Sequence, residues 1–224
     1  MSQPKRPFLG ESAESRISAR RKVLLDTAFR MAAESGWKGV SIHQLCQQAG
    51  LNKRYFYESF SDLESLGAAL VDDLAEQLIA IGQAAVLSGM QQGFDTLALA
   101  RHALQHSIGW LVDDPRRARM LFSMAGDNPR ALQHRQDVIR KFAQTLSAFS
   151  IEYHQATEPH AIAKVGSALL IGGTIEIVIG WLDGQLEVSL DELVEDVAGF
   201  WVAVGDSAIE QTRKRLEKKG AARK

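Results

Sequence analysis

The stretch that decides the fold is Ser41-Ile-His-Gln-Leu-Cys-Gln-Gln-Ala-Gly-Leu-Asn-Lys-Arg-Tyr-Phe-Tyr-Glu-Ser-Phe60. Its apolar side chains first recur at a helical spacing that stops at Gly50, and Asn52 then stands where it can cap a second short helix. Two short helices joined by a tight turn containing glycine are typical of a helix-turn-helix, whose second helix enters the major groove of DNA. The stretch therefore predicts a DNA-binding module.

The second of these helices, residues 53–58, is the candidate for contacting bases. Leu51, Phe56 and Phe60 are expected to hold it on the module, which leaves its polar side exposed. Lys and Arg suit guanine edges or phosphates, and Tyr hydroxyls suit phosphates or base edges. Asn52 either caps the helix or contacts DNA. For the other four candidates, the alternative to a DNA contact is a solvated position on the surface. The remaining candidates on this helix are Lys53, Arg54, Tyr55 and Tyr57.

The sequence in front of this stretch completes a small three-helix module. Residues 16–35 carry an apolar helical stripe, while the basic run at 20–22 projects elsewhere. Gly36 suits the residue after a helix end, and Trp37 is expected to enter the small core.

The rest of the chain is expected to be helical as well. The prolines interrupt no apolar run, and no alternating strand pattern is visible. Capping boxes begin at Ser41, Ser61 and Ser189. We expect an all-α chain of about nine helices, covering 16–35, 41–48, 52–58, 62–87, 94–113, 115–125, 129–155, 159–184 and 190–218. The expected divisions are an arm at 1–15, the helix-turn-helix module at 16–61, a larger helical domain at 62–219 and a tail at 220–224.

Charge is distributed unevenly along the chain. Residues 1–60 hold ten Lys or Arg against five Asp or Glu, whereas residues 61–212 hold nine against twenty-one. A basic head on an acidic body suggests that the head meets a polyanion. Lys5, Arg6 and Arg16 either follow the minor groove as an arm or stay disordered. The basic tail from residue 213 is expected to be a solvated helix end.

Composition and motifs exclude several classes of protein. A single cysteine, Cys46, excludes a disulfide framework and fits a small buried residue in a reducing cytoplasm. No signal peptide, catalytic signature or dinucleotide-binding fingerprint is visible, so we expect no enzyme and no cofactor. The histidines are scattered, and we expect no metal site. The apolar run 165–182 contains Glu176, whose cost in a bilayer favours a deeply buried helix of a soluble protein.

Several motifs resemble the TetR (tetracycline-repressor) family of bacterial regulators. Ala49, Gly50, Tyr57 and Phe60 occur together at family spacing, followed by a capped helix. The matching stretches are 24–37, 40–60 and 62–66. The resemblance implies that Tyr57 contacts a backbone phosphate, that Ser41 supplies the capping hydroxyl of the first short helix, and that Lys53, Arg54 and Tyr55 contact bases.

Four positions depart from the family pattern. Arg54 replaces a small residue and makes the helix unusually basic, and Ala32 replaces an aromatic, which leaves Trp37 to fill the core. Ser59 and Leu63 stand where the family commonly has a His and a Lys that touch phosphate. The resemblance therefore does not imply phosphate contacts at these two positions.

The resemblance also implies that the larger domain dimerises through its last two helices and binds a small-molecule effector. Interior glycines in 159–184 and the apolar surface of 190–218 support the interface independently. Its candidates are Gly172, Gly173, Val197, Trp201 and Val204. Candidates for an apolar pocket are Trp110, Phe122, Phe142, Phe149, Tyr153, Glu176 and Trp181. Glu176 needs a partner, a ligand or water, and the dimer interface would serve it equally well.

These observations predict a cytoplasmic homodimer that binds a double-stranded DNA operator. Repression of a palindromic site, relieved by a lipophilic effector through a pendulum-like movement of helix 62–87, is the family default. A ligand-independent or partner-controlled DNA-binding protein is the alternative. A helical protein–protein adaptor is a third class, which would lack salt-dependent affinity for duplex DNA.

Overall fold

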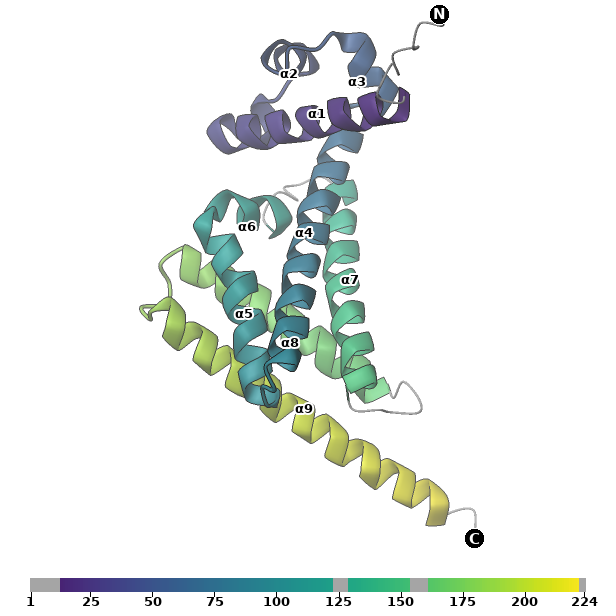
Figure 1. Ribbon diagram of the computed structural model, residues 1–224, viewed down its shortest axis with the longest axis vertical. Helices are drawn as coiled ribbons and strands as arrows, with labels where there is room; N and C mark the ends of the chain where they lie inside the picture. Colours follow the sequence, from purple (N-terminus) through teal and green to yellow (C-terminus); the bar gives the residue numbers. More distant parts are fainter. Residues whose placement is uncertain (1–12, 123–128, 154–160, 222–224) are drawn as a thin grey trace, which may run out of the picture. The chain divides into compact units, whose positions relative to one another are not determined.

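The computed structural model describes residues 13–122, 129–153 and 161–221. Within these ranges it contains nine α-helices and no strand (Figure 1), which confirms the predicted all-α class. The helices are α1 Ala13–Ser35, α2 Ile42–Gln48, α3 Lys53–Ser59, α4 Leu63–Gln91, α5 Thr96–Asp113, α6 Pro115–Phe122, α7 Pro129–Tyr153, α8 Ala161–Leu182 and α9 Leu190–Ala221, with a short 3-10 turn at Trp37–Gly39.

The chain divides into two compact units, Met1–Val71 and Asp72–Lys224. The division falls inside α4, so this helix begins in the first unit and continues into the second. Its first turns contribute Leu66 and Leu70 to the core of the first unit.

The first unit is a small helical module with a predominantly apolar centre. The side chains of Leu24, Leu45 and Phe56, from α1, α2 and α3, are completely buried there. Cys46 is buried beside them, as predicted, and this burial raises the pKa of its thiol. Each of the three helices thus places an apolar stripe in one shared core.

Trp37 packs against α4 at Gly67, within the first unit. A Cβ at Gly67 would lie only 2.7 Å from Cζ2 of Trp37, so the indole approaches the helix backbone closely. Ala32 is buried nearby in α1 but supplies little volume. Trp37 itself is half-buried, so it packs at the edge of this core and does not enter its centre as predicted.

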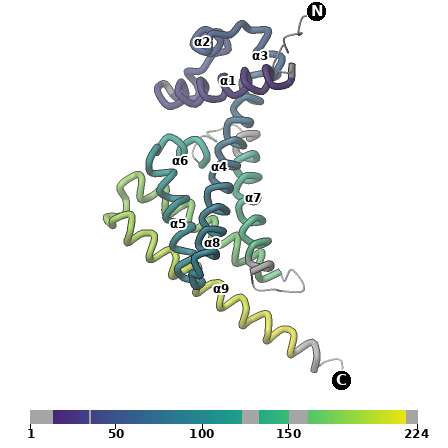
Figure 2. Tube along the Cα trace, in the orientation of Figure 1, coloured from purple at the N-terminus to yellow at the C-terminus, as the bar shows by residue number. Residues whose placement is uncertain are grey.

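The second unit is a layered helical body. In it α7 packs on α8, α8 on α9, and α5 on α9, while the short α6 contacts α5 and α8. The part of α4 that belongs to this unit lies beside α7, where Glu76 pairs with Lys141 and Asp72 pairs with His134. The Cα trace shows α9 continuing past the other helices toward the C-terminus (Figure 2).

Side-chain caps set the start of several helices. Ser189 and Glu192 form a reciprocal capping box at α9: each side chain accepts a hydrogen bond from the backbone N–H of the other residue. At α4 the predicted box at Ser61 is wrong by one residue. Asp62 is the cap, accepting from the Ser65 N–H at 2.7 Å, and the Ser65 hydroxyl accepts from the Asp62 N–H.

The expectation that 165–182 is deeply buried is wrong for the single chain. Of the α8 residues only Ser167, Ile175 and Val178 are buried. One face of α8 packs on α7 and α9, and the opposite face, including Val165 and Leu169, stays open. Among the described helices, α8 alone is long and apolar enough to span a membrane.

Candidate functional site

The turn between α2 and α3 orients the second short helix. Gly50 adopts a φ of 65°, a conformation that disfavours a side chain, and the Leu51 N–H returns to the Cys46 carbonyl at 2.9 Å. Asn52 then caps α3, because its side-chain oxygen accepts a hydrogen bond from the Tyr55 N–H at 3.2 Å. The predicted capping role of Asn52 is confirmed.

The outer side of α3 is basic and exposed. Lys53 is exposed, the Arg54 side chain is 84% exposed, and Tyr57 is 57% exposed. Phe56 faces the opposite way and is completely buried. Helical geometry thus places these three polar side chains where they can meet a ligand as large as DNA.

Two other candidates have structural partners of their own. Ser41 caps α2: its hydroxyl oxygen accepts from the Gln44 N–H at 3.3 Å and donates to the Gln44 side-chain oxygen at 2.9 Å. Tyr55 is half-buried, and the Arg20 guanidinium lies over its ring at 4.3 Å from the centroid. One face of the Tyr55 ring is therefore covered by α1.

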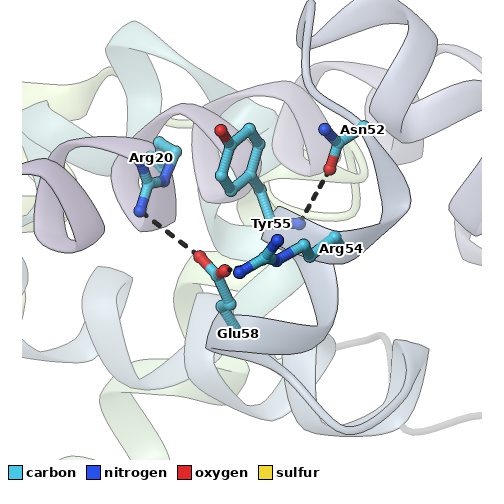
Figure 3. A network of polar contacts seen from close by, with 5 residues as sticks. All are labelled: Arg20, Asn52, Arg54, Tyr55 and Glu58. Carbon is cyan, nitrogen blue, oxygen red and sulfur yellow. Dashed lines mark hydrogen bonds and ion pairs between the residues drawn. The ribbon is translucent and has the colours of Figure 1, made fainter.

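Glu58 connects the basic residues of α1 and α3 (Figure 3). One of its carboxylate oxygens is 3.3 Å from Arg20 and the other is 3.2 Å from Arg54. The side chains of Arg20 and Glu58 are partly exposed, at 24% and 31%, whereas that of Arg54 is open. The network fixes Arg20 between a carboxylate and the Tyr55 ring, and it gives Arg54 a preferred direction along α3.

Arg21 holds the other end of α3. Its guanidinium donates to the Ser59 carbonyl at 3.1 Å and lies 4.4 Å from the centroid of the Phe60 ring. Sequence reasoning missed this role, because it treated the basic run of α1 as projecting away from the module. The two partners are 38 residues apart in the sequence, so no local pattern predicted their contact.

The second unit contains a partly open cavity of about 910 Å³. Its walls come from α4, α5, α7, α8 and α9, with Phe122 from the end of α6. Three of the predicted pocket residues, Phe122, Phe142 and Phe149, line it. Trp201, predicted at the dimer interface, also lines the cavity, and its indole N–H donates to the Thr174 hydroxyl at 2.9 Å.

The other predicted pocket residues lie elsewhere. Trp110 stacks under the Arg117 guanidinium, at 4.4 Å from its ring centroid. The indole N–H of Trp181 donates to the Val188 carbonyl at 2.7 Å and so ties the end of α8 to the following loop. Glu176 is exposed on the open face of α8, so water solvates its carboxylate in the single chain. The Tyr153 side chain lies outside the described residues.

Some of the interface candidates are accessible in the single chain, and one is buried in its core. Gly172 and Gly173 have open space where a Cβ would stand, and Gly173 is exposed. Val204 is half-buried and lies near Gly166, whose Cβ would be 3.5 Å away. Val197 is only 3% exposed, so it belongs to the core of its own chain and is removed from the interface set.

The N-terminal arm can be placed only in part. Lys5 and Arg6 lie outside the described residues, whereas Arg16 is exposed on α1. Within the described part of the chain, no group of three or more His, Cys, Asp or Glu side chains could hold a metal ion.

Comparisons with known proteins agree with this geometry. Residues 24–70 match the family of bacterial regulatory proteins described as the tetR family. An uncharacterised HTH-type transcriptional regulator of Haemophilus influenzae is 35% identical over 54 residues, which are 24% of this chain and 26% of that protein. The match thus spans about a quarter of the relative's length.

Solved structures share the fold over most of the chain. The transcriptional regulator FadR of Bacillus subtilis, in complex with stearoyl-CoA, is 18% identical with a TM-score of 0.64, over 82% of this chain and 98% of that one. A tetR-family transcriptional regulator of Streptomyces coelicolor is 16% identical with a TM-score of 0.66, over 92% of this chain and 89% of that one.

Proposed function

We propose that this chain, whose residues 24–70 match the tetR family of bacterial regulatory proteins, is a repressor that an effector releases from a palindromic operator. The observation that carries the proposal is the exposed basic side of α3, held by a glycine turn, an Asn52 cap and two arginines of α1. A helix presented in this way can enter a major groove with its base-contacting side chains already oriented.

Contacts within the site fall into two kinds. Lys53 and Arg54 carry the donors that match guanine O6 and N7, and Tyr55 stands beside them. Tyr57, Ser41 and Asn52 suit phosphate contacts, which position the module without selecting a sequence. In Asn52 the side-chain oxygen is engaged in capping, so its NH₂ group is the part that would reach a phosphate.

The test is binding to DNA selected by the protein itself. Duplexes enriched from a random library would be compared with a scrambled duplex by fluorescence anisotropy at two salt concentrations. We expect a preference on the order of a thousandfold for an enriched site with two-fold symmetry. Equal, weak and steeply salt-dependent binding to both duplexes would contradict sequence-specific regulation.

The open faces of α8 and α9 support a homodimer. Val165, Leu169 and Phe200 are each 63–66% exposed in the single chain, and Gly173 lies on the same side of α8 as the first two. Apolar side chains at this spacing form a stripe along α8, which a second copy would cover. Two copies related by a two-fold axis would then match a palindromic operator.

The cavity supports release by an effector rather than ligand-independent binding. Its volume, about 910 Å³, is at the upper end of small-molecule sites, and its lining is predominantly apolar. The Bacillus subtilis relative of the same fold was solved with stearoyl-CoA, so molecules with long acyl chains are the first effectors to test. Because α4 both lines the cavity and begins in the first unit, it is the element through which an effector would act.

The effector is tested on the protein–operator complex. A library of lipophilic compounds would be added at saturating DNA occupancy, and we expect at least one to lower operator affinity by about a hundredfold, within the range of allosteric coupling. A ligand-independent regulator would bind its operator equally in the presence of every compound that occupies the cavity. Either kind of regulator would act in the cytoplasm, where bacterial DNA is accessible.

A further inference from the structure

Two histidines of α5, His102 and His106, lie one turn apart with their rings in contact. The ring centroids are 4.3 Å apart and the ring planes meet at 63°. A separation of four residues places both side chains on one face of the helix, the arrangement with which a helix offers two nitrogens to one metal ion. The histidines that look scattered in the sequence thus include one pair that α5 brings together.

The spacing of the two rings suits a single metal ion between them. A coordinating imidazole nitrogen lies about 2.1 Å from the ion, which puts the ring centroid roughly 3.2 Å from it. Two such rings at right angles would have centroids roughly 4.5 Å apart, against roughly 5.2 Å at a tetrahedral angle. The observed 4.3 Å is close to the right-angle value. Adjacent positions at right angles are typical of the tetragonal geometry of Cu²⁺ and Ni²⁺.

The backbone fixes the tautomer of His106. Its Nδ1 lies 2.8 Å from the carbonyl oxygen of His102. A carbonyl can only accept, so Nδ1 carries the proton and donates it, which leaves the lone pair of Nε2 free in the neutral ring. Metal-binding histidines are commonly oriented in this way, by a hydrogen bond from the other ring nitrogen. The His106 side chain is exposed, so an ion in solution can reach it.

His102 is held in place and is neutral at neutral pH. Its half-buried ring meets the edge of Phe94 at 5.4 Å between centroids, and its Cδ2 would be 3.6 Å from a Cβ at Gly89. Burial, and to a smaller extent the neighbouring His106, lower the pKa of His102 below its ordinary value. Neutral imidazole is the form that binds metal. Among the described residues, the ring nitrogens of His102 have no hydrogen-bond partner that would compete with an ion.

The carboxylates of α9 beside this part of α5 are already engaged. Glu195 accepts a hydrogen bond from Arg101 at 2.6 Å, and Asp191 accepts one from Gln105 at 3.5 Å. In the described part of the chain, no third His, Cys, Asp or Glu joins the two histidines in a metal-binding group. An ion bound here would therefore have two nitrogen ligands from the protein, and water would fill its other positions.

We propose that His102 and His106 form an open binding site for a divalent transition metal ion, with Cu²⁺ and Ni²⁺ preferred. The proposal does not depend on DNA binding or on an effector, because the ligands and their supports all belong to the second unit. Since the two ligands come from successive turns of one helix, binding should also stabilise the folded state.

The test measures binding of Cu²⁺ or Ni²⁺ alone to the untagged full chain at neutral pH. Titration calorimetry should show one tightly bound ion per chain, and the electron paramagnetic resonance spectrum of the copper complex should show two equatorial nitrogens. The second ligand acts at a high effective concentration once the first has bound, so His106→Gln should weaken binding at least about tenfold. Because His106 is exposed, this variant is expected to fold.

A matched control removes a histidine from elsewhere. His43 is exposed on α2, and His43→Gln should leave the affinity for both ions unchanged. Saturating Ni²⁺ should raise the midpoint of thermal unfolding of the unmodified protein and of His43→Gln, but not that of His106→Gln. His102→Gln should lose binding as His106→Gln does, and His106→Gln alone decides the test if His102→Gln is unstable.

Three results would overturn the proposal: equal affinities of the unmodified protein and His106→Gln, a copper spectrum with fewer than two nitrogen ligands, or no binding of either ion. Each would show that the contact between the two rings serves packing alone. Operator binding is measured on separate samples without metal, so its failure would reject the regulator and leave the metal site standing.

Discussion

Glu58 is an acidic residue on the face of a helix expected to meet a polyanion. Its carboxylate pairs with Arg20 and Arg54, so its own charge is compensated inside the module. Exposed ion pairs contribute little to stability, about 0–1 kcal/mol. We therefore infer that Glu58 positions two guanidinium groups, and its negative charge opposes binding to any duplex.

Glu58→Gln should lower discrimination more than stability. Without the carboxylate, Arg54 loses its preferred direction, and the module gains positive charge toward any duplex. We expect several-fold tighter binding to scrambled DNA and a smaller preference for the selected site, measured by anisotropy on both duplexes. Asp183→Asn at the end of α8 removes the same charge as a control. A preference equal to that of the unmodified protein would contradict the positioning role.

Arg54 and Tyr57 should respond differently to substitution. Arg54→Ala removes donors to base edges, so it should cost about 1–3 kcal/mol on the selected site and relax base preference at one position. Tyr57→Phe removes a phosphate contact and should weaken binding to all duplexes alike. Repeated selection with each variant measures both effects. Equal, sequence-independent losses would show that Arg54 does not contact a base.

At the scale of the element, α3 is too short to be stable alone. Isolated helices below about 12 residues are marginal in water, and α3 has seven. Its order comes from the Asn52 cap at the start, Phe56 in the core, and Arg21 on the Ser59 carbonyl at the end. The helix that we propose contacts DNA is thus held by tertiary contacts at both ends.

Substitutions at Asn52 separate capping from DNA contact. Asn52→Ala should destabilise the first unit by about 1 kcal/mol, because the Tyr55 N–H loses its acceptor. Asn52→Asp keeps an equally good cap but adds a negative charge near phosphate, so it should retain stability and weaken DNA binding. Urea unfolding and anisotropy measure the two properties. Loss of stability in both variants would exclude a simple capping role.

The capping box of α9 makes stability depend on pH. Hydrogen bonds from the Ser189 backbone N–H and hydroxyl lower the pKa of Glu192 below its ordinary value of 4.5. Since the folded pKa is depressed, this contribution is present above pH 4.5 and is lost as the pH falls through the folded value. The Glu192→Gln variant keeps a capping box, because Gln can also cap back. Measured by thermal unfolding, it should lose less stability than the unmodified protein between about pH 5 and pH 3. Equal losses of stability in the variant and the unmodified protein would contradict a contribution from the Glu192 carboxylate.

At the scale of the whole molecule, α8 and α9 each expose large apolar side chains to solvent in the single chain. Leu169 and Phe200 are large apolar side chains exposed in the single chain, and Gly173 leaves space for another backbone. A single chain cannot cover this surface, because α5 and α7 already occupy the opposite sides of the two helices. The chain is therefore expected to function as two copies.

Phe200→Lys should convert the dimer to a monomer. A charge in the middle of an apolar isologous interface is buried twice, once in each copy, and has no partner there. Light scattering after size-exclusion chromatography should show half the mass, and operator affinity should fall at least about a hundredfold because a half-site binds alone. Ile17→Lys, another exposed apolar position, serves as the control. A Phe200→Lys variant that stays dimeric would place the interface elsewhere.

The fold class and the position of the helix-turn-helix could be predicted without a structure. Helical periodicity, the glycine at position 50 and the Asn52 cap are local signals, which act over a few residues and can be recognised without a structure. The charge contrast between the two parts of the chain was equally visible. These features depend on backbone geometry and local hydrogen bonds, which are the same in any fold that contains them.

Which helix faces meet could not be predicted from the sequence. Periodicity shows that a helix has an apolar face, but not whether that face covers a cavity, a core or nothing, so Phe122 was placed correctly while Trp181 and Val197 were not. The pairing of Arg20 with Glu58 joins residues 38 apart. Such contacts are set by the packing of α1 on α3, because long-range packing is decided by the complementarity of two surfaces and one sequence segment describes only one of them.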